Sequence, residues 1–270
     1  MTGKKIGIIG CGNMGEALLS KLAKTLEKSV SLMVSELDAK RRAAIQDKYK
    51  IIVEIDNNLL VKYCDIIILA VKPQSLEDVL RQEVCCGVTE SKILISIAAG
   101  VTTKHIETVV GKDVPVIRAM PNMPAKIGEA VTAICAGTSA STADMKIAKD
   151  IFATIGDVVV VDEKLMDAVT AVSGSGPAYF FYFIEALARA GEGLGLDVKT
   201  AEELAIKTAI GSAELLEQMK EHPADLRKRV TSKGGTTEAA LKVLDDRKMM
   251  DVIEAAVAAA CRRSKELSKG

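Results

Sequence analysis

The sequence contains no tryptophan, and aromatic residues make up only 3% of its 270 residues. It also has no net charge, because 36 basic side chains balance 36 acidic ones. A chain without excess positive charge has no overall field to hold nucleic acid or an anionic membrane, and few aromatic rings leave little surface for base stacking. We therefore expect a small-molecule partner, and neither nucleic acid nor a membrane.

Long apolar runs are also missing, since none reaches the length that spans a bilayer. Met1 to Lys5 leads directly into an apolar segment, without the basic region and cleavage site of a secretory signal. The six cysteines form no CxxC pair, and the adjacent Cys85 and Cys86 are too close for an ordinary disulfide. These features favour a reducing compartment, so we expect a cytoplasmic protein with no bound metal.

Short apolar runs alternate with helical patterns through the first 162 residues. We predict strands over Lys5 to Ile9, Ser31 to Val34, Ile66 to Val71, Ile93 to Ile97, Val114 to Met120, Val131 to Ala136 and Val158 to Val161. Helices are expected between them, for example over Gly15 to Leu26 and Ala39 to Lys48. Such alternation is typical of an α/β domain with a mostly parallel sheet, whose strands are buried on both faces.

The first predicted strand runs directly into Gly10-Cys11-Gly12-Asn13-Met14-Gly15, after which a helix begins. This is GxGxxG in the strand-to-helix context of a dinucleotide site. Gly10 permits the tight turn, Gly12 lets the backbone approach a pyrophosphate, and Gly15 allows close helix packing. The other explanation is a tight turn with no ligand; the context favours a Rossmann-type domain over residues 1–162.

The cofactor itself stays open between NAD and NADP. The second predicted strand is followed by Glu36, which can accept a hydrogen bond from a ribose 2′-hydroxyl and favours NAD. Ser35, together with Lys40, Arg41 or Arg42, can instead hold the 2′-phosphate of NADP. An ordinary solvated helix start also explains the basic run.

Two further strand ends point to the same ligand. Ala70-Val71-Lys72-Pro73 and Ala98-Ala99-Gly100 follow neighbouring predicted strands, at the sheet edge where open α/β folds bind ligands. Small residues there leave room for a flat ring, and Lys72 either contacts the cofactor or occupies a loop.

From Glu163 to Leu267 the sequence has no comparable strand run and is rich in Ala, Leu, Glu and Lys. We predict that residues 163–270 form an all-helical substrate-binding and dimerisation domain. The aromatic stretch Tyr179 to Phe183 is expected to pack in the core or in a dimer. Neither His105, at a predicted helix start, nor His222, before Pro223, is expected to be catalytic.

Three further segments, together with the Gly-rich turn and Ala70-Val71-Lys72-Pro73, resemble pyrroline-5-carboxylate reductases from Ile6 to about Leu244. They are Arg118-Ala-Met-Pro-Asn-Met-Pro124, Ser173-Gly-Ser-Gly-Pro-Ala-Tyr179 and Val230-Thr-Ser-Lys-Gly-Gly-Thr-Thr237. The resemblance implies NAD(P)H-dependent reduction of L-1-pyrroline-5-carboxylate to L-proline, the last step of proline biosynthesis, in dimers or larger homo-oligomers. It also implies that Ser35, Asn57 and Lys72 contact the cofactor. Lys233, where many relatives carry Pro, and Glu36 depart from the family pattern, and Glu36 leaves the usual NADPH preference open.

Thr237 precedes a good helical pattern and is expected at or near the helix N-cap. Gly234 and Gly235 let the preceding loop turn its N–H groups inward, as in carboxylate and phosphate sites. We therefore expect Ser232, Gly234, Gly235 and Thr236 to bind the substrate carboxylate and the Thr237 hydroxyl to act as the catalytic group at the ring nitrogen. A Gly-containing turn between helices, with a capping Thr, explains the same residues without a ligand.

Two other functions compete with imine reduction. A β-hydroxyacid dehydrogenase shares the two-part organisation but needs a base such as Lys on the first helix after the dinucleotide domain. The stretch from Ser173 to Ala190 contains no Lys, which argues against it. A non-catalytic dinucleotide sensor would have no use for Gly234-Gly235-Thr236-Thr237.

Overall fold

The computed structural model describes residues 3–25 and 31–267. Met1, Thr2 and Leu26, on which part of the predictions fall, lie outside the described residues. The chain divides into two compact units, residues 1–175 with 260–270 and residues 176–259. The structural units therefore differ from the predicted dinucleotide-binding domain of residues 1–162 and substrate-binding domain of residues 163–270. That functional division stays a prediction.

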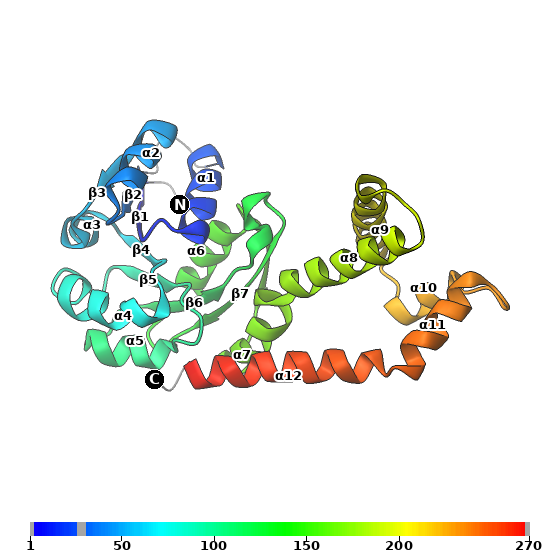
Figure 1. The fold of residues 1–270 in the computed structure, drawn as a ribbon. Helices are drawn as coiled ribbons and strands as arrows, with labels where there is room; N and C mark the ends of the chain where they lie inside the picture. Colours follow the sequence, from blue (N-terminus) through cyan, green and yellow to red (C-terminus); the bar gives the residue numbers. More distant parts are fainter. Residues whose placement is uncertain (1–2, 26–30, 268–270) are drawn as a thin grey trace. The chain divides into compact units, whose positions relative to one another are not determined.

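The described residues of the first unit form one eight-stranded sheet in the order β3-β2-β1-β4-β5-β6-β7-β8 (Figure 1). All neighbouring strands are parallel except β6 and β7, which run antiparallel. The strands are β1 (Lys5–Ile9), β2 (Ser31–Ser35), β3 (Ile52–Glu54), β4 (Ile66–Leu69), β5 (Ile93–Ser96), β6 (Val116–Met120), β7 (Ala130–Ala136) and β8 (Gly156–Val160). The predicted α/β class with a mostly parallel sheet is confirmed.

Each predicted strand exists, with shifts at the ends. The strand predicted over Ile66 to Val71 is β4, which ends at Leu69 because the chain turns there into the helix that starts at Pro73. One strand was missed: β3 is only three residues long and lies at the sheet edge, where it is half exposed. A strand that short shows no alternation that a sequence pattern can detect.

Two apolar layers pack against the sheet. On one face α1 (Asn13–Thr25), α2 (Ala39–Tyr49) and α6 (Thr142–Phe152) cover side chains such as Ile6, Ile8 and Ile68. On the other, α3 (Asn57–Tyr63), α4 (Pro73–Val79), the π-helix Leu80–Val84 and α5 (Thr103–Val110) cover Ile67, Leu69 and Leu94. Burial on both faces explains why the strands are apolar throughout. The 3₁₀ helices Met123–Lys126 and Glu163–Leu165, α7 (Met166–Val169) and the π-helix Thr170–Gly174 complete this unit.

The second unit is helical, as predicted. It contains α8 (Gly176–Gly193), α9 (Val198–Met219), α10 (Pro223–Arg229), α11 (Thr236–Asp246) and the start of α12 (Met249–Leu267), and no strand occurs in the described chain after Val160. Gly195, with a φ of +100°, lies in the turn between α8 and α9, and Asp197 caps α9 by accepting the Thr200 N–H.

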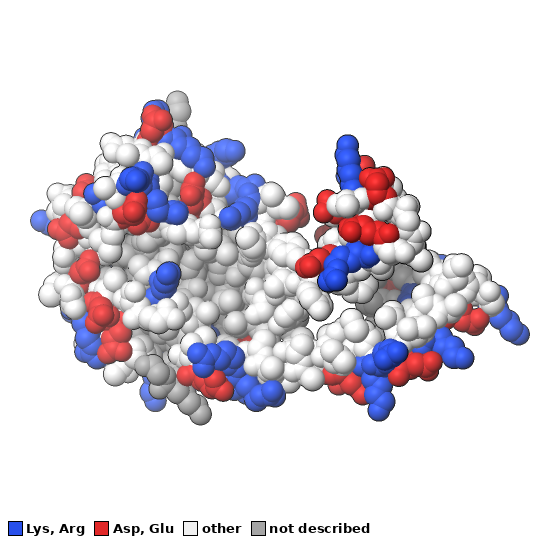
Figure 2. All heavy atoms as spheres, viewed as in Figure 1, with Lys and Arg blue, Asp and Glu red and all other residues white. Residues whose placement is uncertain are grey.

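The surface shows the balanced charge of the sequence. On the face drawn in Figure 2, Lys and Arg side chains lie among Asp and Glu side chains on each unit. Within residues 3–25 and 31–267, no helix is long and apolar enough to cross a membrane.

Candidate active site

The Gly-rich turn connects β1 to α1 as predicted. Gly10 has a φ of +87°, which favours glycine, and its N–H donates to the Ser35 carbonyl (2.9 Å). A β-carbon added at Gly12 would meet no atom within 4 Å. The space over Gly12 is therefore open, directly before the first helical residue, Asn13.

This turn has the form needed to hold a dinucleotide pyrophosphate. The first N–H groups of α1 have no acceptors within the helix, and its dipole favours an anion at this end. The open space at Gly12 lets a ligand approach the backbone where any side chain would project. The residues present thus fit a nicotinamide dinucleotide.

The Cys11 side chain points into the core and not toward the open space over Gly12. Its side chain is fully buried in the apolar layer beneath α1. Burial, together with the nearby Glu16 and Glu36 carboxylates, raises the pKa of the Cys11 thiol to about 12. Cys11 therefore contributes its backbone to the turn, and its neutral thiol packs the core.

The end of β2 lies beside this turn. The Glu36 carboxylate accepts the Cys11 N–H (3.2 Å) and the Asp38 N–H (3.0 Å). Arg41 donates to the Cys11 carbonyl and approaches Glu36 at 3.7 Å. Ser35 is only 2% exposed, so its side chain lies within the protein at the last position of β2.

The end of β4 meets the turn as well, and β5 is the next strand of the sheet. The Ala70 N–H donates to the Ile9 carbonyl (2.8 Å), and a β-carbon on Gly10 would lie 3.0 Å from the Ala70 carbonyl oxygen. Lys72 is the exposed residue that precedes α4, and Pro73 is the first residue of that helix, with Val71 half-buried before them. Ala98 is buried after β5, and its N–H donates to the Ser96 hydroxyl (3.3 Å).

Asn57, which the resemblance points to, is the first residue of α3 and is 4% exposed. Its Nδ2 donates to the Glu83 carboxylate (2.5 Å). Among the described residues its Oδ1 has no hydrogen-bond partner. Within the described residues the Asn57 amide is therefore held through its nitrogen and not through its oxygen.

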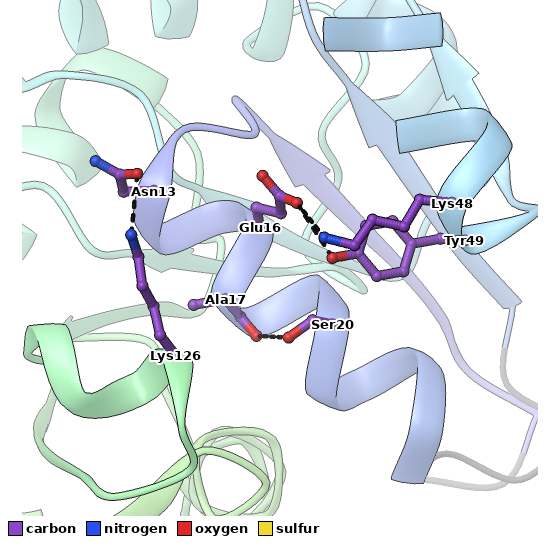
Figure 3. A pocket seen from close by; sticks show the side chains of 7 residues that line it. All are labelled: Asn13, Glu16, Ala17, Ser20, Lys48, Tyr49 and Lys126. Carbon is purple, nitrogen blue, oxygen red and sulfur yellow. Dashed lines mark hydrogen bonds and ion pairs between the residues drawn. The ribbon is translucent and has the colours of Figure 1, made fainter. Parts of the chain in front are cut away.

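Lys126 is a neighbour of the turn that the sequence did not reveal. Its ammonium lies 3.3 Å from Asn13 Oδ1, at one end of a pocket of about 270 Å³ (Figure 3). At the other end, Glu16 accepts from Lys48 (2.9 Å) and from the Tyr49 hydroxyl (3.2 Å). The hydrogen bond from Lys48 lowers the pKa of the Glu16 carboxyl. Lys126 and Asn13 are 113 positions apart, so no local pattern could have placed this cation near α1.

The Val230 to Thr237 segment, in the second unit, forms a loop that leads into α11. Gly234 has a φ of +73°, and the Gly235 N–H donates to the Ser232 carbonyl (3.0 Å). Gly235 is the residue that precedes the helix, so Thr236 and Thr237 are its first two residues; Thr237 is half-buried and Ser232 and Thr236 are exposed. Thr237 thus lies near the N-cap, but the capping position belongs to Gly235.

Not every backbone N–H group of this loop is available to a ligand. The Gly234 N–H donates to the Glu238 carboxylate (2.7 Å), so a carboxylate of the chain itself already occupies it. The N–H groups of Thr236 and Thr237 are at the helix start, where the helix supplies no acceptor. These two groups are therefore the donors of the loop best suited to an anion.

The Arg118 to Pro124 segment has mainly structural contacts in the first unit. Arg118 is buried and pairs with Glu163 (3.4 Å), which also accepts from the Thr103 N–H (2.7 Å) and hydroxyl (2.6 Å). Asn122 donates to the Ser173 carbonyl (3.2 Å) and accepts the Val131 N–H (3.1 Å). These contacts hold β6 and the following 3₁₀ helix in place.

Comparison with known proteins identifies relatives of the whole chain. Residues 163–267 match the family model for pyrroline-5-carboxylate reductase dimerisation, and residues 5–100 match that for coenzyme F420-dependent NADP oxidoreductases. The pyrroline-5-carboxylate reductase of Synechocystis sp. is 43% identical, covering 98% of each chain, and that of Methanosarcina acetivorans is 40% identical, covering 100% of each. A Plasmodium falciparum pyrroline carboxylate reductase, solved with NADP bound, superposes with a TM-score of 0.89 at 32% identity, covering 99% of each chain.

Identity at this level over the full length exceeds what a shared Rossmann-type fold alone produces. It extends through both the dinucleotide turn and the helical second half, the two parts that the resemblance joined. The chain belongs to the pyrroline-5-carboxylate reductase family.

Proposed function

We propose that this protein reduces L-1-pyrroline-5-carboxylate to L-proline with NAD(P)H, the last step of proline biosynthesis. The observation that carries the proposal is the full-length identity to pyrroline-5-carboxylate reductases in a chain whose Gly12 leaves the start of α1 open. The first supports the reaction and the second supports the cofactor.

The Gly10 to Gly15 turn holds the pyrophosphate in this proposal. Ser35, Asn57, the Ala70 to Pro73 segment and Ala98 are the other cofactor residues, and they surround the carboxyl ends of β2, β4 and β5, with Asn57 after β3. When bound, NAD(P)H supplies the hydride that reduces the C=N bond. The chain itself has to position the imine carbon and exclude competing reactions.

The loop before α11 binds the substrate carboxylate in this proposal. Ser232, Gly234, Gly235 and Thr236 form it, and the N–H groups at the helix start attract an anion. The adjacent Thr237 hydroxyl accepts or donates a hydrogen bond at the ring nitrogen and keeps the imine in one orientation. A protonated imine is already electrophilic, so no strong base is required.

The competing functions have less support. A β-hydroxyacid dehydrogenase needs a base such as Lys on the helix after the dinucleotide domain, and α8 carries none as far as Ala190. A sensor without catalysis does not account for full-length identity to reductases.

Residues 1–162 are proposed to bind the dinucleotide and residues 163–270 to bind substrate and form a homodimer or larger homo-oligomer. The family model for dimerisation begins at residue 163. The helices also expose apolar side chains in the single chain, including Phe180 (67%) and Tyr182 (75%) of α8. Large exposed apolar surfaces mark association sites.

We further propose that the enzyme works in the cytoplasm. All six of its cysteines are unpaired thiols, which suits a reducing compartment.

The test is oxidation of NADH and of NADPH by the purified protein with pyrroline-5-carboxylate, measured side by side with chromatographic detection of proline. Substrate-dependent oxidation that yields proline in equal amount supports the proposal. Dinucleotide binding without turnover would favour the sensor, and turnover of β-hydroxyacids alone would favour the β-hydroxyacid dehydrogenase.

A further inference from the structure

Glu36 occupies a special position at the carboxyl end of β2. Its backbone N–H donates to the Glu54 carbonyl (3.1 Å), which fixes the residue against β3. Its side chain is only 13% exposed, and the carboxylate accepts N–H groups from Cys11 and Asp38. The carboxylate is therefore held beside the Gly-rich turn and does not extend into solvent.

In Rossmann-type domains this strand end faces the adenosine ribose. A carboxylate there accepts a hydrogen bond from a 2′-hydroxyl, whereas a 2′-phosphate brings a second negative charge close to it. Holding NADP at such a site requires free cations to offset both charges.

The guanidinium groups of Arg41 and Arg42 already donate hydrogen bonds within the chain. Arg41 donates to the Cys11 carbonyl and lies within 3.7 Å of Glu36 and 3.6 Å of Glu16. Arg42 donates to the carbonyls of Glu36 (2.9 Å) and Leu37 (2.6 Å). Both arginines thus tie the loop after β2 to itself and to the Gly-rich turn.

From these contacts we infer that Glu36 is the specificity-determining residue for the cofactor and that the enzyme prefers NADH to NADPH. The inference rests on the proposed function and deepens it by naming the reductant. Arg41 acts as a positioning residue for the Glu36 carboxylate and the Gly-rich turn, and it does not hold a phosphate.

The experiment is calorimetric titration of the substrate-free protein with NADH and NADPH, which needs no turnover. We expect NADH to bind at least about tenfold more tightly, the size of effect of one hydrogen bond to a charged group. Glu36→Gln removes the charge and should reduce that ratio by about tenfold. Asp47→Asn, an equal charge change at an 86% exposed position of α2, is the matched control and should leave the ratio within about twofold.

Arg41→Gln distinguishes the roles of the two side chains. If Arg41 positions the Gly-rich turn and the Glu36 carboxylate, its loss weakens NADH binding at least as much as NADPH binding; selective weakening of NADPH would overturn the inference. Equal binding or tighter NADPH binding by the unaltered protein would overturn it too, whether or not the variants fold. Tight, selective NADH binding without reduction of pyrroline-5-carboxylate would support the inference on Glu36 and contradict the proposed function.

Discussion

A β-carbon on Gly15 would lie 2.3 Å from the carbonyl oxygen of Gly10. The start of α1 therefore approaches the end of β1 as closely as it does because Gly15 has no side chain. We predict that Gly15→Ala lowers the free energy of unfolding by about 1–3 kcal/mol, since the backbone must shift to accept the methyl group. Urea unfolding followed by circular dichroism measures the change.

Gly211→Ala is the matched control for that substitution. Gly211 lies inside α9, and a β-carbon there meets no atom within 4 Å. Alanine should stabilise that helix by about 0.5–1 kcal/mol. An equal loss of stability in both variants would mean that close packing at Gly15 is not the cause.

Gly12→Val is expected to weaken dinucleotide binding and leave the fold intact. The space around Gly12 is open, so the new side chain meets no protein atom at its β-carbon and projects instead where the pyrophosphate is proposed to bind. Calorimetric titration with NADH measures the affinity, and circular dichroism checks the fold. Unchanged affinity in a folded variant would leave the turn with a structural role only.

Thr237→Ala should lower turnover far more than it weakens cofactor binding. A hydrogen bond to a charged nitrogen contributes about 1.5–3 kcal/mol, which is about ten- to a hundredfold in kcat if the bond forms in the transition state. Gly235, not Thr237, takes the capping position, so stability should change by less than about 0.5 kcal/mol. Steady-state kinetics at saturating NAD(P)H make the comparison.

Thr237→Ser is the control, because it keeps the hydroxyl and removes only a methyl group. It should retain most of the activity. A Thr237→Ala enzyme as fast as the parent would remove Thr237 from the reaction and leave the loop as a simple turn.

The helical second half should make the protein a dimer or larger at micromolar concentration. No residue of α11 is buried in the single chain, and side chains such as Val243 and Val252 are 59% and 57% exposed. Association removes such surface from water. Sedimentation velocity tests this, and a fully active monomer would refute it.

The buried thiols of Cys11, Cys64 and Cys135 should resist alkylation, whereas the exposed thiol of Cys86 should react. Burial raises the pKa of Cys11 and Cys135 to about 12 and that of Cys64 to about 11, whereas Cys86 is exposed. At about pH 8, iodoacetamide should modify Cys86 and spare these three, because thiolates are the reactive form. Mass spectrometry of the labelled peptides shows which residues react.

The same thiols should make the free energy of unfolding depend on pH in the alkaline range. Their pKa values are raised in the folded state, so the unfolded chain loses protons above about pH 9 that the folded chain retains. Stability should therefore be full below that pH and decrease as the pH rises toward 11 or 12. Urea titrations across that range measure it; constant stability would show that the thiols do not titrate differently on folding.

Local patterns were sufficient for much of this protein. The strand that runs into Gly10-Cys11-Gly12-Asn13-Met14-Gly15 and then a helix was predictable because the apolar run, the glycines and the helical pattern are adjacent in the chain. The helical second half was predictable for the same reason. The short edge strand Ile52–Glu54 was not, since three residues carry no period.

Sequence by itself thus determined the α/β class, the dinucleotide turn and the family. Only the tertiary structure decided which groups meet: Lys126 with Asn13, Glu36 with the Cys11 N–H, and Glu83 with the Asn57 amide. It also showed that Arg41 and Arg42, open as phosphate ligands in the sequence, are engaged within the chain. The physical reason is that hydrogen bonds and charge pairs depend on distances of a few ångströms between segments far apart in the sequence, which the packing of the sheet and its helices sets.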